Sequence, residues 1–225
     1  EKSAYLIIYF GLYKCYNKII RNEIKNDKLN KQMWGCGGIF ILHEEVDYML
    51  TPKQNMLEVI KGGNPDRFVN QYEAVQLLFH PFMFANPLLQ PGQENVVNAW
   101  GVTNTFPKGV PGSFPVHTPD KIVVKDIEDW KDYVHAPSLK FTQDQWDMVK
   151  AQYDAVDGEQ AFKAAFVAPG LFEQTHHLCE ISNALVYYIT NPDEMHDLIK
   201  YLTEWELELA EGICSNLHPD ALFHH

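Results

Sequence analysis

The chain has 225 residues, of which 46% are hydrophobic and 13% aromatic, and its formal net charge is −12. The hydrophobic content is ample for a packed core, and the length suits one domain or a large part of one. The negative charge argues against a nucleic-acid-binding protein and against docking on anionic lipid, because both need a basic face. Four cysteines without paired spacing favour the reducing cytoplasm, and the apolar run 4–13 is too short to span a bilayer.

Residues 1–48 differ from the rest of the chain in charge. They hold seven of the eighteen Lys and Arg residues but only six of the thirty Asp and Glu residues. The segment His43–Val46 can be encoded by a purine-rich stretch typical of a bacterial ribosome-binding site, a short distance before Met49. We therefore expect residues 1–48 to be a translated leader or a disordered extension. The alternative is a genuine N-terminal extension.

The segment that follows predicts a capped amphipathic helix over 52–61. Thr51 can cap it, Gln54 completes a Thr-x-x-Gln capping box, and a proline fits the first helical position. A Gly-Gly pair then ends the helix. Three apolar side chains form its stripe: Met56, Leu57 and Ile60.

The middle of the chain predicts a strand over 95–102 and then a β-hairpin or ordered loop over 105–119. A short acidic helix is expected over 126–133. A second capping box, from Thr142 to Gln145, predicts a helix with an apolar face of Trp146, Val149, Tyr153 and Val156.

In the last third of the chain, segments with the apolar pattern of a strand alternate with segments that have the apolar pattern of a helix. The predicted elements are a strand over 161–168, a helix over 171–190, a helix beginning at Asn191-Pro192 and a strand over 221–225. The long helix carries an apolar stripe: Met195, Leu198, Leu202, Trp205 and Leu209. Strands alternating with helices predict a parallel α/β sheet, in a doubly wound fold or a (β/α)8 barrel. No GxGxxG or Walker pattern follows any predicted strand, which weakens the case for a nucleotide-binding doubly wound fold.

Several segments resemble, in order, motifs of the uroporphyrinogen decarboxylase-like (URO-D) superfamily. They are Thr51-Pro-Lys-Gln followed by Gly63-Asn-Pro-Asp-Arg67, Asn98-Ala-Trp-Gly-Val102, Pro115–Pro137, Ala165–Glu180 and His218–His225. Asn98 stands where these relatives carry an acidic residue. The resemblance covers 49–225 and implies the N-terminal portion of a (β/α)8 TIM barrel. A minimal barrel needs about 250 residues, so we expect this one to be truncated near mid-barrel.

The superfamily contains both decarboxylases and corrinoid-linked methyltransferases. A polycarboxylate such as uroporphyrinogen needs several guanidinium groups, and Arg67 is the single arginine from Met49 onward. We therefore expect a methyltransferase that moves a methyl group between a methylated small molecule and a corrinoid or a thiol acceptor. The alternatives are uroporphyrinogen decarboxylase and a non-catalytic fragment or adaptor that binds a corrinoid protein.

The resemblance also implies the cofactors. The corrinoid would be carried on a partner protein, and zinc, where relatives use it, would have ligands beyond residue 225. No metal ligand is assigned within the chain. On a helix His176 and His177 diverge by about 100°, so His176-His177-x-Cys179 is better read as core packing than as a zinc site.

Candidate site residues lie near the ends of predicted strands, where barrel enzymes place their chemistry. The expected catalytic residues are Glu173, His224 and His225. The expected substrate-binding residues are His80, Asn98, Trp100 and Phe172. Asp66 and Arg67 are expected to form a structural clasp near the site. The competing interpretations are a packed histidine for His80, a first-turn glutamate favoured by the helix dipole for Glu173 and a solvated end for the histidine pair.

Overall fold

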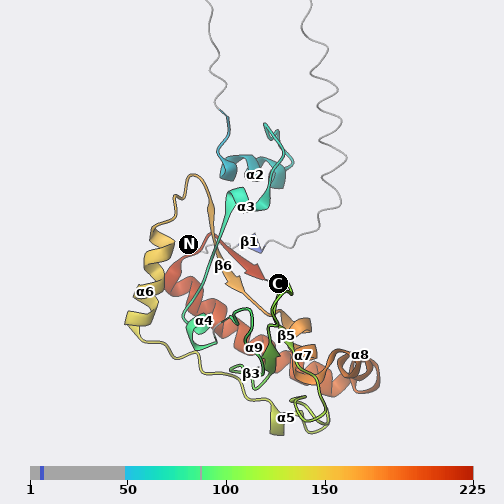
Figure 1. The fold of residues 1–225 in the computed structure, drawn as a ribbon. Coiled ribbons are helices and arrows are strands. Elements are labelled where there is room, and N and C mark those ends of the chain that lie inside the picture. Colours follow the sequence, from blue (N-terminus) through green and yellow to red (C-terminus); the bar gives the residue numbers. More distant parts are fainter. Residues whose placement is uncertain (1–5, 8–48, 87, 225) are drawn as a thin grey trace, which may run out of the picture. The chain divides into compact units, whose positions relative to one another are not determined.

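The computed structural model describes residues 6–7, 49–86 and 88–224, and it confirms the α/β class (Figure 1). The described sheets have the strand orders β1-β7-β6-β2 and β3-β4-β5, and neither closes into a barrel. The element bounds are β1 Leu6–Ile7, α2 Pro52–Lys61, α3 Gln71–Ala74, β2 Val75–Leu78, α4 Phe82–Ala85, β3 Val96–Val97, β4 Thr103–Thr105, β5 Phe114–Pro115, α5 Trp130–Tyr133, α6 Gln143–Asp154, β6 Phe162–Val167, α7 Leu171–Cys179, α8 Ile181–Thr190, α9 Pro192–Leu217 and β7 Ala221–His224.

The chain divides into two compact units. The larger comprises 77–155, 163–225 and the first seven residues, and the smaller comprises 8–76 and 156–162. Apart from Leu6–Ile7, the expected leader 1–48 lies outside the described residues. None of the described helices combines the length and the apolar character needed to cross a bilayer.

In the larger unit, β6 and β7 are parallel neighbours, as the alternation of helices and strands predicts. Their register pairs Ala164 with Ala221 and Val167 with His224, and β1 adds to β7 in parallel. Parallel strands need a crossover between them. Here α7, α8 and α9 supply it (Figure 1).

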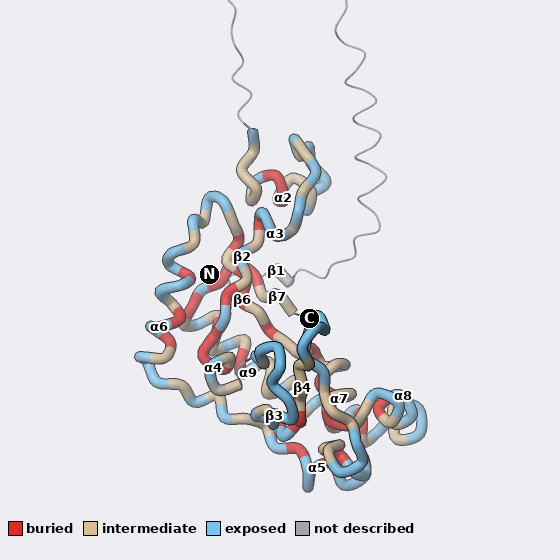
Figure 2. Tube along the Cα trace, in the orientation of Figure 1, coloured by how far each residue is buried: buried red, intermediate tan, exposed pale blue. Residues whose placement is uncertain are grey.

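Helix α9 carries much of the core of this unit. The predicted stripe is confirmed, because its four aliphatic members are buried and Trp205 is partly buried. Buried residues also run along β6 (Figure 2). On α6 three of the four expected residues of the apolar face are buried: Trp146, Val149 and Tyr153. The fourth, Val156, follows the end of the helix at Asp154 and is only partly buried. A Cβ on Gly212 would meet the Trp146 ring at 3.4 Å, so this glycine permits the close packing of α9 against α6.

Three predicted boundaries are wrong. The strand expected over 95–102 ends at Val97, because Asn98 starts a turn that Gly101 completes at φ +79°. The acidic helix is reduced to Trp130–Tyr133, since the Asp126 side chain accepts from the Glu128 amide in a turn. The helix expected over 171–190 breaks at Glu180, whose φ is +72°.

Two further expectations are confirmed in this unit. The segment 105–119 contributes to a β-hairpin, in which Asn104 pairs with Pro115 and Thr105 with Phe114 in antiparallel fashion. Both hydrogen bonds of the α6 capping box are present: the Thr142 side chain accepts from the Gln145 amide, and the Gln145 side chain accepts from the Thr142 amide.

The smaller unit is organised around α2. Its capping box between Thr51 and Gln54 and its left-handed C-cap at Gly62 are as predicted. Met56 is buried, whereas Ile60, at the end of the expected stripe, is exposed. The start of α2 is tied to the 158–160 turn by the bond from the Lys53 amide to the Gln160 carbonyl, 3.0 Å long.

Candidate functional site

The carboxyl ends of β6 and β7 form the edge where the sequence predicts chemistry. Phe166 pairs with Phe223, and Val167 pairs with His224 in the last register position. In parallel α/β sheets, ligands bind outside this edge because the loops and helix ends there are free to vary. His224 is therefore positioned at the end of β7, while His225 lies outside the described residues.

His224 is held by a glutamate that the sequence interpretation missed. Its Nε2 lies 3.1 Å from Oε2 of Glu206, which projects from α9. The Glu206 side chain is 15% exposed and the His224 side chain 30%. Burial raises the pKa of the Glu206 carboxyl, and the hydrogen bond and charge of His224 act in the opposite direction.

The sequence does contain a signal for Glu206. It follows Leu202 by four residues and precedes Leu209 by three, so it falls on the apolar stripe of α9. Acidic side chains are rarely buried without a partner. A glutamate on the apolar face of a helix therefore indicates either a partner or a site.

His80, an expected substrate-binding residue, lies against the same edge and is 1% exposed. Its Nε2 is 3.0 Å from the carbonyl oxygen of Phe166. A carbonyl only accepts, so Nε2 carries the proton and Nδ1 is the acceptor. Nδ1 has no hydrogen-bond partner among the described residues. Burial lowers the pKa of His80 to about 4, against the smaller effect of the Phe166 carbonyl, so the ring is neutral at neutral pH.

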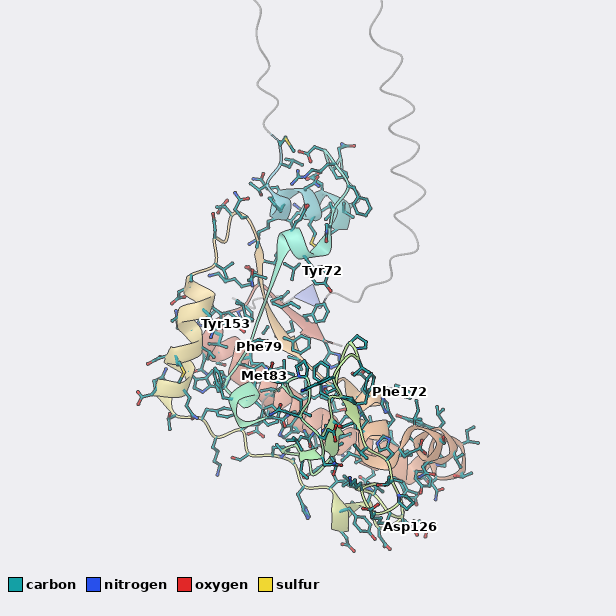
Figure 3. The ribbon with its side chains drawn as sticks, in the orientation of Figure 1. Tyr72, Phe79, Met83, Asp126, Tyr153 and Phe172 are labelled. Atoms are coloured by element: carbon teal, nitrogen blue, oxygen red, sulfur yellow. The ribbon has the colours of Figure 1, made fainter. Side chains whose placement is uncertain are left out.

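Aromatic side chains continue this edge. Phe166 stacks on Phe223 with ring centroids 5.9 Å apart, and Phe79 meets Phe166 edge-on at 6.3 Å. Phe79 follows β2 and is exposed (Figure 3). The three rings form an apolar surface on one face of the sheet, and the His224 side chain, one residue after Phe223, points to the other face.

Trp100, a second expected substrate-binding residue, is buried and packs against Trp205 with ring centroids 4.9 Å apart. Trp205 also meets Phe82 at 5.0 Å, and its indole N–H donates to the Pro137 carbonyl at 2.8 Å. This packing fixes the part of α9 that carries Glu206. Trp100 is therefore a core residue that packs against α9 at the position before Glu206.

Asn98 holds the turn before β4. Its Oδ1 accepts from the amides of Trp100 and Val102, at 2.9 and 3.0 Å. An aspartate in this position would offer an equivalent acceptor oxygen to the two amides. The Asn98 side-chain oxygen is therefore engaged within the turn.

Phe172 and Glu173 lie in the first turn of α7, in a second group of side chains. Phe172 is 49% exposed (Figure 3). It stacks on Tyr188, with ring centroids 6.2 Å apart. Glu173 acts on the imidazoles of His176 and His177. Burial lowers the pKa of both, to about 4 for His177, and the negative charge of Glu173 acts in the opposite direction.

Asp66 and Arg67 form the expected clasp within the smaller unit. Arg67 Nη1 lies 2.8 Å from Asp66 Oδ1 and donates to the Leu50 carbonyl at 2.9 Å. The Leu50 amide in turn donates to Asp66 Oδ2 at 2.6 Å. Asn55, buried on α2, bonds the same loop through the Asp66 amide and the Arg67 carbonyl.

Within the described ranges, no group of three or more histidine, cysteine or acidic side chains is arranged to hold a metal ion. Cys179 is buried, and burial raises its thiol pKa to about 12, which opposes the thiolate that zinc needs. His176 and His177 have their ring centroids 4.6 Å apart, in an edge-on contact.

Comparison of the chain with protein-family models, with curated proteins and with solved structures gives no match.

Proposed function

We propose that this chain is a URO-D-like methyltransferase and that the sheet containing β6 and β7 is a sector of a (β/α)8 barrel. It moves a methyl group between a methylated small molecule and a corrinoid, or a thiol acceptor. The observation that carries the proposal is the His224–Glu206 pair at the carboxyl end of parallel strands. An imidazole held by a buried carboxylate is suited to proton transfer at neutral pH.

Methyl transfer from an oxygen, nitrogen or sulfur atom leaves negative charge on that atom. A protonated imidazole beside it neutralises the charge, which lowers the barrier to departure. In the opposite direction, the neutral imidazole takes the proton of a thiol and so makes the thiolate that attacks. His224 serves both directions because its ring remains partly exposed while Glu206 is mostly buried.

The corrinoid, when bound on its partner protein, supplies the cobalt centre that carries the methyl group. A corrin is a broad flat ring, and the exposed Phe79 ring together with Phe166 and Phe223 would offer it an apolar surface at this end of the sheet. Zinc with ligands beyond residue 225 belongs to the same proposal.

The arginine content favours methyl transfer over uroporphyrinogen decarboxylation. Arg67 is the single arginine in 49–225, and its guanidinium is engaged by Asp66 and the Leu50 carbonyl. A substrate with many carboxylates needs several free guanidinium groups. The decarboxylase alternative is therefore the weaker one.

The test is a spectroscopic assay with the full chain. Reduced cobalamin is mixed with methoxylated, methylamine and methylthiol compounds in turn, and the cobalt absorption spectrum is followed. We expect the spectrum of the methylated form to appear with one of these donors. If none of them is demethylated, or if the chain instead decarboxylates uroporphyrinogen, the proposal is wrong.

A further inference from the structure

Glu206, the partner of His224, projects from a part of α9 that is firmly packed. Its sequence neighbour Trp205 is anchored by the Pro137 carbonyl and by two aromatic rings. Leu202 and Leu209, one turn to either side, are buried. The carboxylate is therefore carried by a fixed stretch of helix in a mostly buried position, and His224 is its hydrogen-bond partner within the described part of the chain.

A buried carboxylate is costly unless a donor pairs with it. The 3.1 Å contact between Oε2 and Nε2 needs one proton between the two atoms. An imidazole is a stronger base than a glutamate carboxylate by about two pKa units in the reference state. The proton therefore belongs to Nε2, and the glutamate accepts.

We propose that Glu206 is a positioning residue that holds His224 as the Nε2–H tautomer and so makes Nδ1 the proton-accepting atom of the site. Which ring nitrogen is basic is set by the hydrogen bond of the other nitrogen. In the described residues, no hydrogen bond occupies His224 Nδ1. This inference rests on the proposed function only for the identity of the ligand that brings the proton.

One proton leaves an O–H or S–H group of the ligand and bonds to Nδ1. The ring becomes an imidazolium, and its Nε2–H still donates a hydrogen bond to the Glu206 carboxylate. The electron pair of the broken bond remains on the ligand oxygen or sulfur. The reverse transfer gives the proton back to a departing atom.

The experiment uses the full chain labelled with ¹⁵N at histidine, with the two ring-nitrogen shifts of His224 assigned by loss of signal in His224→Gln. Spectra are recorded at a pH where the imidazoles are neutral. We expect a pyrrole-type Nε2 and a pyridine-type Nδ1. Glu206→Gln is nearly isosteric and should give a mixture of tautomers, because an amide can both donate and accept.

Glu208→Gln is the matched control, because it removes the same charge from an exposed position on the same helix and should leave the tautomer unchanged. A wild-type His224 in the Nδ1–H form would overturn the inference, as would a Glu206→Gln spectrum identical to wild type. The wild-type spectrum suffices even where a variant folds poorly.

The same variants separate this inference from the proposed function. In the cobalamin assay Glu206→Gln should lower kcat by about 10- to 100-fold with little change in KM, and Glu206→Asp should recover part of the loss. If the tautomer is as expected but no methyl group moves, the proposed function fails and the positioning role stands.

Discussion

The turn at Asn98 gives the sharpest stability prediction. Its Oδ1 accepts two backbone amides, those of Trp100 and Val102, and both residues are buried. Asn98→Ala leaves two donors without a partner, and each costs about 1–3 kcal/mol. The backbone bonds of the turn remain, so we expect a total loss of about 2–4 kcal/mol.

Asn98→Asp is the matched variant. It retains an acceptor oxygen in the same place and should stay within about 0.5 kcal/mol of wild type, because a carboxylate accepts amide hydrogen bonds at least as well as an amide oxygen does. Urea unfolding followed by tryptophan fluorescence measures both. With a slope of about 2 kcal/mol per molar urea, in the middle of the usual range, the alanine midpoint should fall by about 1–2 M. Equal losses in the two variants would refute this account of the turn.

Three further predictions concern the core, a cap and a buried imidazole. Leu198→Ala should cost about 2–5 kcal/mol because Leu198 is fully buried, whereas Leu207→Ala, on the same helix but 58% exposed, should change the unfolding free energy by less than about 0.5 kcal/mol. Thr142→Ala removes the side-chain cap of α6 and should cost about 1 kcal/mol in the same urea assay. The pKa of His80 falls from 6.5 unfolded to about 4 folded, so the unfolded chain binds more protons between these values. The protein should lose stability as pH falls through this window, by about 3 kcal/mol in total. Urea midpoints at several pH values should show a shallower loss for His80→Gln, and an unchanged pH dependence would contradict the burial of this ring.

The elements that the sequence predicts well have strong local determinants. Two Thr-x-x-Gln boxes mark the starts of α2 and α6, and the long apolar stripe marks α9. The apolar run 162–167 becomes a central strand because it is buried along most of its length. The parallel pairing of β6 with β7 follows from the helices between them, since a crossover is what parallel strands require.

The break at Glu180 has no such determinant. No glycine or proline stands there, and the residue adopts a positive φ. Its carboxylate accepts from the Asn183 amide, and Asn183 donates back to the Cys179 carbonyl at 3.0 Å. These side-chain bonds end α7 and start α8, and helical periodicity alone does not reveal them.

The site was only partly accessible from sequence for a related reason. His224 follows from its place at the end of a strand, but its partner comes from a helix 18 residues earlier in the chain. Glu206 is acidic on an apolar stripe, and this signal has meaning only once the strand that faces it is known. His80 is similar, since its bond to the Phe166 carbonyl joins residues 86 positions apart.

The most direct test of the account is the single-turnover rate of methyl transfer to cobalamin by wild type and by His224→Gln, with Leu207→Ala as the control. The account predicts a rate about 100-fold lower for the glutamine variant, the scale of general acid–base catalysis, and an unchanged rate for the control. Equal rates for wild type and His224→Gln would show that this imidazole takes no part in the reaction and would contradict the account.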